Sequence, residues 1–115
     1  DQAVAADNGD ANALYYRAMA RARLEQRAQA IEDLRLAIQL QPDFERAQLE
    51  LAAVLIDDGQ YDAALAVLDQ VRRTPGNEGK AHFLTGLAQL RQDRPEESRS
   101  SFRAAAAADP QLAAT

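Results

Sequence analysis

The chain has 115 residues, of which 47% are hydrophobic and 27% charged, a composition typical of one folded domain and not of a disordered chain. It contains no cysteine, which excludes disulfide bridges, thiol catalysis and cysteine-ligated zinc sites. A net charge of -5 without a clustered basic face argues against nucleic acid or an anionic membrane surface as a partner, and no apolar run is long enough to span a membrane.

Residues 1–10 are expected to form a polar, acidic lead-in to the folded part. They lack the basic and apolar regions of a signal peptide, and the chain does not start with methionine, which indicates a mature chain or an excised piece of a longer one. Arginine and alanine are abundant while Lys80 is the only lysine, a bias typical of GC-rich bacteria. We therefore expect a soluble protein of the bacterial cytoplasm or periplasm, since the lack of cysteine is compatible with both.

The dominant feature of the remaining sequence is an internal repeat with a period of 34 residues. Shifting the sequence by this length aligns residues of similar size. Small residues align as Ala18, Ala52 and Gly86 and as Ala30, Ala64 and Ser98, and large residues align as Leu34, Leu68 and Phe102. The repeat divides the chain into units 11–44, 45–78 and 79–112, which we expect to form a single domain followed by a short tail, 113–115.

Each unit is predicted to form two helices, because its apolar residues recur close to the helical period. The expected helices are 11–24, 28–41, 45–58, 62–73, 79–92 and 95–108. Asp10 and Asp43 are predicted to be N-caps of the first helices of units one and two. Gly59 suits the left-handed residue that follows a helix end, and Pro95 suits the first turn of the last helix.

These patterns resemble the tetratricopeptide repeat family over residues 11–112. The family's Leu-Gly-x2-Tyr stretch appears as Leu51-Ala52-x2-Leu55 and Thr85-Gly86-x2-Gln89, and its Ala-x3-Phe stretch as Ala30-x3-Leu34, Ala64-x3-Leu68 and Ser98-x3-Phe102. Unit one departs most, with Arg17 and Arg21 at family positions that are apolar, while Glu25 and Asp93 replace the turn glycine. The resemblance implies an all-α fold, a right-handed α-solenoid of three helix-turn-helix repeats that stack to share one core.

The resemblance also implies a binding site on the concave face, which the first helix of each unit lines. Carrying the family's ligand-facing positions onto this sequence gives a groove of eight residues: Tyr15, Met19, Leu49, Ala53, Ile56, Phe83, Leu87 and Leu90. The rim beside them would be mostly basic and consist of Asn12, Arg23, Arg46, Asp57, Lys80 and Arg91. A contiguous apolar patch of this kind usually marks an interaction site.

The predicted function is that of a non-catalytic protein-protein interaction module whose groove binds an apolar or amphipathic peptide or helix with acidic flanks. The alternative is a structural adaptor or self-association domain, whose groove is filled intramolecularly or by the partner in a homodimer. We expect no nucleic acid, no membrane insertion, no metal and no cofactor. His82 has no second histidine or cysteine as a co-ligand, and Ser98, Ser100 and Ser101 have no adjacent general base, so neither group predicts an enzyme.

Three arginines on the first helix, Arg17, Arg21 and Arg23, leave two interpretations open. They form either the exposed terminal face of a first repeat or a docking point for Asp7 and Asp10 of the lead-in or for another domain.

Overall fold

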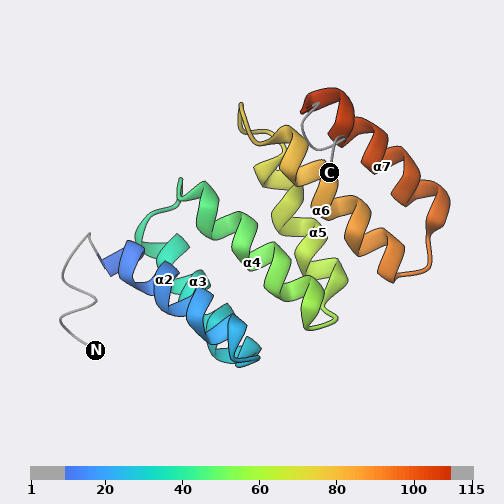
Figure 1. Ribbon diagram of the computed structural model, residues 1–115. Helices are drawn as coiled ribbons and strands as arrows, with labels where there is room; N and C mark the ends of the chain where they lie inside the picture. Colours follow the sequence, from blue (N-terminus) through green and yellow to red (C-terminus); the bar gives the residue numbers. More distant parts are fainter. Residues whose placement is uncertain (1–9, 110–115) are drawn as a thin grey trace.

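The computed structural model describes residues 10–109, and over this range it contains six α-helices and no strand. They are α2 (Asp10–Arg23), α3 (Arg27–Leu40), α4 (Glu45–Asp57), α5 (Tyr61–Val71), α6 (Glu78–Arg91) and α7 (Pro95–Ala108). Successive pairs form hairpins that stack from α2 and α3 at the N-terminal end to α6 and α7 at the C-terminal end (Figure 1). The all-α solenoid is therefore confirmed, whereas most of the lead-in (residues 1–9) and the tail (113–115) lie outside the described residues.

All three hairpins turn in the same way. The second residue after the first helix adopts a left-handed conformation, with φ of 60° at Glu25, 81° at Gly59 and 63° at Asp93. The next amide closes the turn by donating to a carbonyl five residues earlier, as in Gln60 N–H to Leu55 O at 2.8 Å. This is the backbone arrangement of a Schellman motif, which favours glycine. Only the middle repeat supplies that glycine.

The helix starts differ from the predicted caps in two places. The expected N-cap role of Asp43 is wrong, because α4 begins one residue later than that cap requires, and Phe44 occupies the capping position without a side-chain cap. Asp10 is the first residue of α2 itself. Pro95, in contrast, lies in the first turn of α7 as predicted, where its missing N–H leaves no helical hydrogen bond unmade.

Small residues let the two helices of each hairpin approach closely. Ala18 and Ala30 are fully buried in the first hairpin, as are Ala52 and Ala64 in the second. In the third hairpin, Ser98 donates a buried hydrogen bond of 2.8 Å to the Gly86 carbonyl. A Cβ atom on Gly86 would lie only 2.8 Å from the Phe102 ring, so the glycine is what makes room for a larger residue than the leucine of the other repeats.

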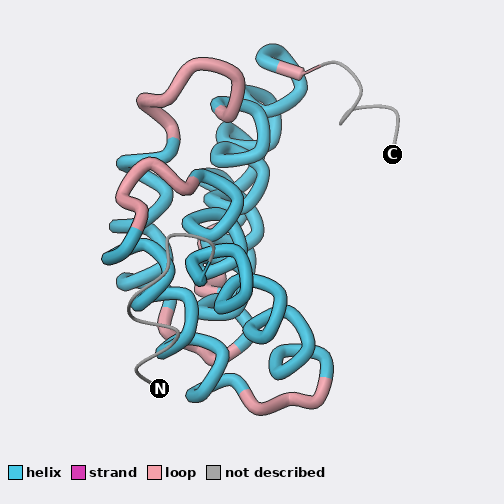
Figure 2. Tube along the Cα trace, turned by 90° about the vertical axis from the view of Figure 1, so that its left-hand side faces the viewer, coloured by secondary structure: helices cyan, strands magenta, loops and turns pink. Residues whose placement is uncertain are grey.

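The hairpins then stack through a second set of contacts. α3 packs on α4, and α5 packs on α6, so the second helix of each repeat supports the first helix of the next. α2 and α6 also contact α4, which places the first helices of the three repeats on one side. Figure 2, viewed from the N-terminal end, shows the helices joined by short loops. Because α4 contacts α2, α3, α5 and α6, it is covered on several sides.

The unusual arginines of unit one form an ion-pair cluster inside their own hairpin. Arg17 donates from Nε and Nη2 to Asp33 of α3 at 3.0 and 2.8 Å, and Arg21 donates from Nη1 at 3.1 Å. Asp33 is buried, so it needs these partners. Arg17 and Arg21 thus have a partner within their own repeat. Asp7, one of the docking partners considered, lies outside the described residues.

Candidate functional site

A shallow hollow of about 320 Å³ opens on the side of the stack formed by the first helices. Its lining comes from all three repeats: Tyr15 of α2, Arg46, Leu49, Glu50 and Ala53 of α4, and Lys80 and Leu84 of α6. Leu49, Ala53 and Leu84 are half-buried, so each keeps some surface open to solvent. The lining thus combines apolar side chains with two basic residues, Arg46 and Lys80, and one acidic residue, Glu50.

Tyr15 forms one end of this hollow but offers little surface. Its ring packs against Phe44 with centroids 5.2 Å apart, and the Arg46 guanidinium lies 5.6 Å from the centre of the ring. These two residues leave the side chain only 9% exposed. The cation–π contact also holds Arg46 over the edge of the hollow, where its charge can meet a ligand.

Glu50 places a carboxylate in these apolar surroundings. Within residues 10–109 the Glu50 carboxylate makes no hydrogen bond or ion pair. Desolvation by burial raises its pKa above the ordinary value, and the nearby Asp57 adds to this, while the positive charge of Arg23 acts in the opposite direction. A half-buried carboxylate without a partner favours a donor or a cation from outside the chain.

The six predicted rim residues, Asn12, Arg23, Arg46, Asp57, Lys80 and Arg91, are all exposed. Two of them compensate each other's charge, because Arg91 donates to Asp57 at 3.1 Å and links α6 to α4. Three basic side chains of the rim, Arg23, Arg46 and Lys80, have no carboxylate within ion-pair distance among the described residues.

The structure brings together only part of the predicted groove. Tyr15, Leu49 and Ala53 share the hollow. Ile56 does not line it: the side chain is 1% exposed, because the middle repeat packs its first helix on several sides, so the expectation that Ile56 faces a ligand is wrong.

The other four predicted groove residues lie elsewhere. Met19 and Leu87 are half-buried against the central core. Phe83 is 39% exposed but turns toward α7, where its ring lies 5.6 Å from that of Phe102. Leu90 is 52% exposed and lines a separate hollow at the C-terminal end of the stack.

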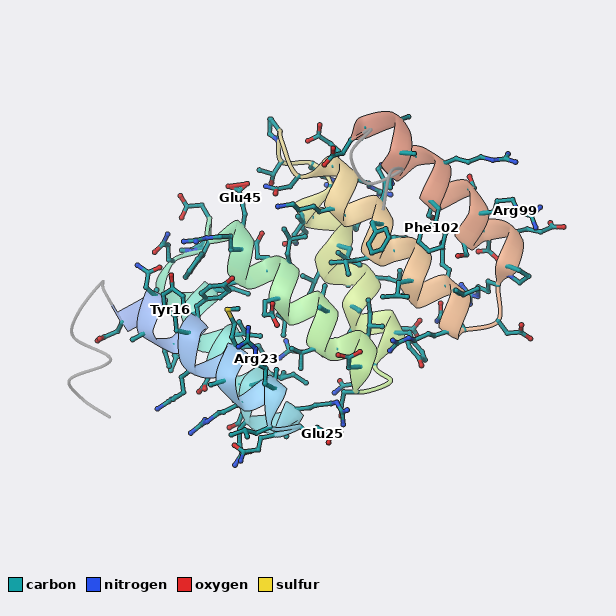
Figure 3. The ribbon with its side chains drawn as sticks, viewed as in Figure 1. Tyr16, Arg23, Glu25, Glu45, Arg99 and Phe102 are labelled. Atoms are coloured by element: carbon teal, nitrogen blue, oxygen red, sulfur yellow. The ribbon has the colours of Figure 1, made fainter. Side chains whose placement is uncertain are left out.

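Two lining residues, Glu50 and Leu84, were missed by the sequence reasoning. They lie one repeat length apart, each directly after a predicted groove residue, Leu49 or Phe83. The family positions carried onto the sequence did not include this row. The repeat itself contains the signal, because Tyr16, 59% exposed, continues the same row on α2 (Figure 3).

Two of the serines considered for catalysis, Ser98 and Ser101, make hydrogen bonds within the third hairpin. Ser98 bonds the Gly86 carbonyl, and Ser101 donates to Gln89 at 2.7 Å. No group of three or more potential metal ligands occurs between residues 10 and 109. In the same range no helix is both long and apolar enough to cross a membrane.

Comparison with known proteins gives one family and several structures. The tetratricopeptide repeat model matches residues 15–78 and 49–113. A crystal structure of MamA is 23% identical with a TM-score of 0.81, covering 97% of this chain and 66% of that chain, and this likeness concerns the fold alone. MamA 41-end from Desulfovibrio magneticus RS-1 is 28% identical with a TM-score of 0.75, covering 90% of this chain and 57% of that chain. The chain thus spans less than two thirds of either MamA chain, and no curated protein sequence matches it.

Proposed function

Because the chain belongs to the tetratricopeptide repeat family, whose repeats serve as protein-interaction scaffolds, we propose that it binds an amphipathic segment of another protein in the hollow across α2, α4 and α6. The observation that carries this proposal is the composition of the hollow. The neighbouring repeats leave the apolar side chains of Leu49, Ala53 and Leu84 partly exposed. Beside them lie Arg46 and Lys80, neither of which has a carboxylate partner among residues 10–109.

The lining indicates the chemistry of the ligand. An apolar side chain of the ligand would lie on Leu49, Ala53 and Leu84, because desolvating these surfaces provides most of the binding energy. Acidic groups on either side of it would approach Arg46 and Lys80, and their attraction chiefly increases specificity and the association rate.

Glu50 adds a requirement that a purely acidic ligand does not meet. Its carboxylate is half-buried and unpaired within the described residues, so binding an apolar group over it would remove water without replacing the lost hydrogen bonds. A ligand that carries one donor, such as a lysine or a backbone amide, over Glu50 would avoid this cost. The proposed ligand is thus amphipathic, with acidic flanks and one donor near its centre.

The test is an affinity capture with the immobilised chain in lysate of the source organism, followed by quantitative mass spectrometry. The wild type is compared with two variants. One is Leu49→Arg, and the other combines Arg46→Glu with Lys80→Glu and so reverses the charge of two exposed side chains. Leu36→Arg and Arg35→Glu serve as matched controls, because both residues are exposed on α3, away from the hollow.

The proposal predicts that the same proteins are lost from both hollow variants and retained by both controls. Circular dichroism at 222 nm checks the fold of each variant. Identical capture by wild type and the Arg46→Glu, Lys80→Glu variant contradicts the proposal, and so does unfolding of Leu49→Arg, because that outcome would place Leu49 in the core.

Sedimentation velocity distinguishes this proposal from the alternative, a structural adaptor whose groove is filled by a second copy. It predicts a dimer that Leu49→Arg or Arg46→Glu converts to a monomer, whereas the proposed ligand-binding module is not dimerised through this hollow.

A further inference from the structure

The basic residue one helical turn before Glu50 does not neutralise its charge. Arg46 stands four positions earlier on α4, a spacing at which arginine and glutamate commonly pair. Its guanidinium instead lies over two aromatic rings, 5.6 Å from the centre of Tyr15 and 5.7 Å from that of Phe44. These cation–π contacts compete with an ion pair between Arg46 and Glu50, and within residues 10–109 that ion pair is not formed.

The other charges near Glu50 leave it unbalanced as well. Arg91 donates to Asp57 at 3.1 Å, so its charge is already matched by that carboxylate. Arg23, the last residue of α2 (Figure 3), attracts the Glu50 carboxylate without forming an ion pair with it, while Asp57 repels it. Lys80 of α6 lines the same hollow and is exposed, again without an ion pair to the described part of the chain. Burial raises the pKa of the Glu50 carboxyl, so desolvation outweighs the attraction of Arg23.

A ligand in the hollow would make this imbalance more costly. Glu50 shares the hollow with Leu49, Ala53 and Leu84, and a ligand that covers these apolar side chains also removes water from the carboxylate. A neutral donor, such as a backbone amide, would restore one hydrogen bond but leave the negative charge unbalanced, and burial of an unpaired charge is unfavourable. A cationic side chain provides both the hydrogen bond and the opposite charge, so it satisfies Glu50 better than a neutral donor does.

The two end segments of the sequence contain no side chain that could supply this cation. Residues 1–9 read DQAVAADNG and residues 110–115 read PQLAAT, and neither segment contains lysine, arginine or histidine. Residues 1–9 instead carry two aspartates, which Glu50 would repel. The 115 residues therefore offer Glu50 no cation beyond the basic residues already around the hollow, none of which pairs with it.

We propose that Glu50 determines ligand specificity: the segment of another protein that binds the hollow places one lysine or arginine on Glu50, between acidic residues that face Arg46 and Lys80. This inference rests on the proposed function, because it specifies the ligand of the same hollow. The aliphatic stem of the cationic side chain lies on the apolar lining, and its charged end donates to the Glu50 carboxylate.

Glu50 then rejects ligands that the rest of the hollow would accept. Arg46 and Lys80 attract any acidic segment, and Leu49, Ala53 and Leu84 accept any apolar side chain. An acidic segment without a central cation would bury the Glu50 carboxylate unpaired or place a like charge beside it. Specificity of this kind depends on the unfavourable contact with the wrong ligand as much as on the favourable contact with the right one.

The probes are three end-blocked synthetic peptides of about 16 residues that share one amphipathic sequence with glutamates on both sides of the centre. They differ only in the central residue, which is lysine, norleucine or glutamate. Norleucine keeps an unbranched aliphatic side chain and removes the charge. Fluorescence anisotropy measures the affinity of each peptide for the wild type, Glu50→Gln, Glu50→Lys and Leu49→Arg. Glu32→Gln and Glu32→Lys are matched controls, because Glu32 is exposed on α3 and does not line the hollow.

We expect the wild type and both Glu32 variants to bind the lysine peptide at least about tenfold more tightly than the norleucine peptide, and the glutamate peptide most weakly. Glu50→Gln should bind the lysine and norleucine peptides about equally, and Glu50→Lys should prefer the glutamate peptide. That reversal separates recognition of the charge from a structural effect of residue 50, which would weaken the binding of all three peptides alike.

Two kinds of failure are distinguishable. Equal affinity of the lysine and norleucine peptides for the wild type, with both weakened by Leu49→Arg, overturns the role of Glu50 and leaves the proposed function intact. If no peptide binds the wild type, or if Leu49→Arg binds them all unchanged, the proposed function is contradicted and this inference with it. Sedimentation velocity that shows a dimer dissociated by Glu50→Lys also overturns the inference, because a second copy of the chain would then supply the cation.

Discussion

The contact between Gly86 and Phe102 gives the sharpest test of how the repeats pack. In the first two repeats the equivalent pairs are alanine with leucine, Ala18 with Leu34 and Ala52 with Leu68. The third repeat instead pairs a glycine, Gly86, with a side chain larger than leucine, that of Phe102. We predict that Gly86→Ala destabilises the wild type but stabilises the Phe102→Leu variant.

The magnitude follows from two opposing effects. Alanine in the middle of a helix is favoured over glycine by about 1 kcal/mol. The new Cβ would lie 2.8 Å from two atoms of the Phe102 ring, so the ring must move by several tenths of an ångström, and overpacking of this kind costs about 1–3 kcal/mol. The net change is a loss of about 0–2 kcal/mol in the wild type and a gain of about 1 kcal/mol beside leucine.

Urea unfolding of the four proteins in this double-mutant cycle, followed by circular dichroism, measures the coupling free energy. We expect a coupling of about 1–3 kcal/mol. If Gly86→Ala changes the free energy of unfolding by the same amount in both backgrounds, the glycine is not there to accommodate the ring, and the reasoning is refuted.

Three further predictions concern single residues, each checked by urea unfolding. Glu25→Gly and Asp93→Gly should each stabilise the chain by about 0.5–1 kcal/mol, because glycine adopts the left-handed turn conformation without the steric penalty. Asp33→Asn should destabilise it by about 1–2 kcal/mol, because two arginines lose their shared partner, whereas the exposed Glu32→Gln should have little effect. Glu50→Gln should raise stability at pH 7, because burial raises the pKa of this carboxyl and thus disfavours its charged form in the folded chain. That gain should vanish below about pH 4.3, where the carboxyl is protonated in both states.

Each of these has a result that would contradict it. Destabilisation by glycine at either turn would mean that a side-chain contact there outweighs the backbone strain. Equal effects at Asp33 and Glu32 would mean that the ion-pair cluster adds nothing to folding. A pH-independent effect of Glu50→Gln would mean that the carboxyl is as well solvated in the folded chain as in the unfolded one.

The helices were predictable because the repeat supplies three aligned copies of one pattern. All six expected helices begin and end within two residues of the observed ones. The turn geometry was harder to foresee, since Glu25 and Asp93 take the left-handed conformation that Gly59 adopts easily. Here the stacking of the hairpins determines the turn, and the individual residue tolerates it.

The candidate site was only partly predictable, because a helical stripe does not reveal what covers it. Tyr15 lies on the expected stripe, but the start of α4 packs Phe44 and Arg46 against its ring. Leu90 and Ile56 share a position in the repeat but differ in exposure, because among the described residues a further repeat follows α4 and α5 and none follows α6 and α7. Contacts between repeats, and not the pattern within one repeat, decide which residues remain free.

The most direct test of the proposed function is an NMR titration of the isotope-labelled chain with a protein segment recovered by the capture experiment. The account predicts that the largest amide shift changes lie around the hollow, at Leu49, Glu50, Ala53 and Leu84. Shift changes confined to α3 and α5, with those four amides unmoved, would contradict it.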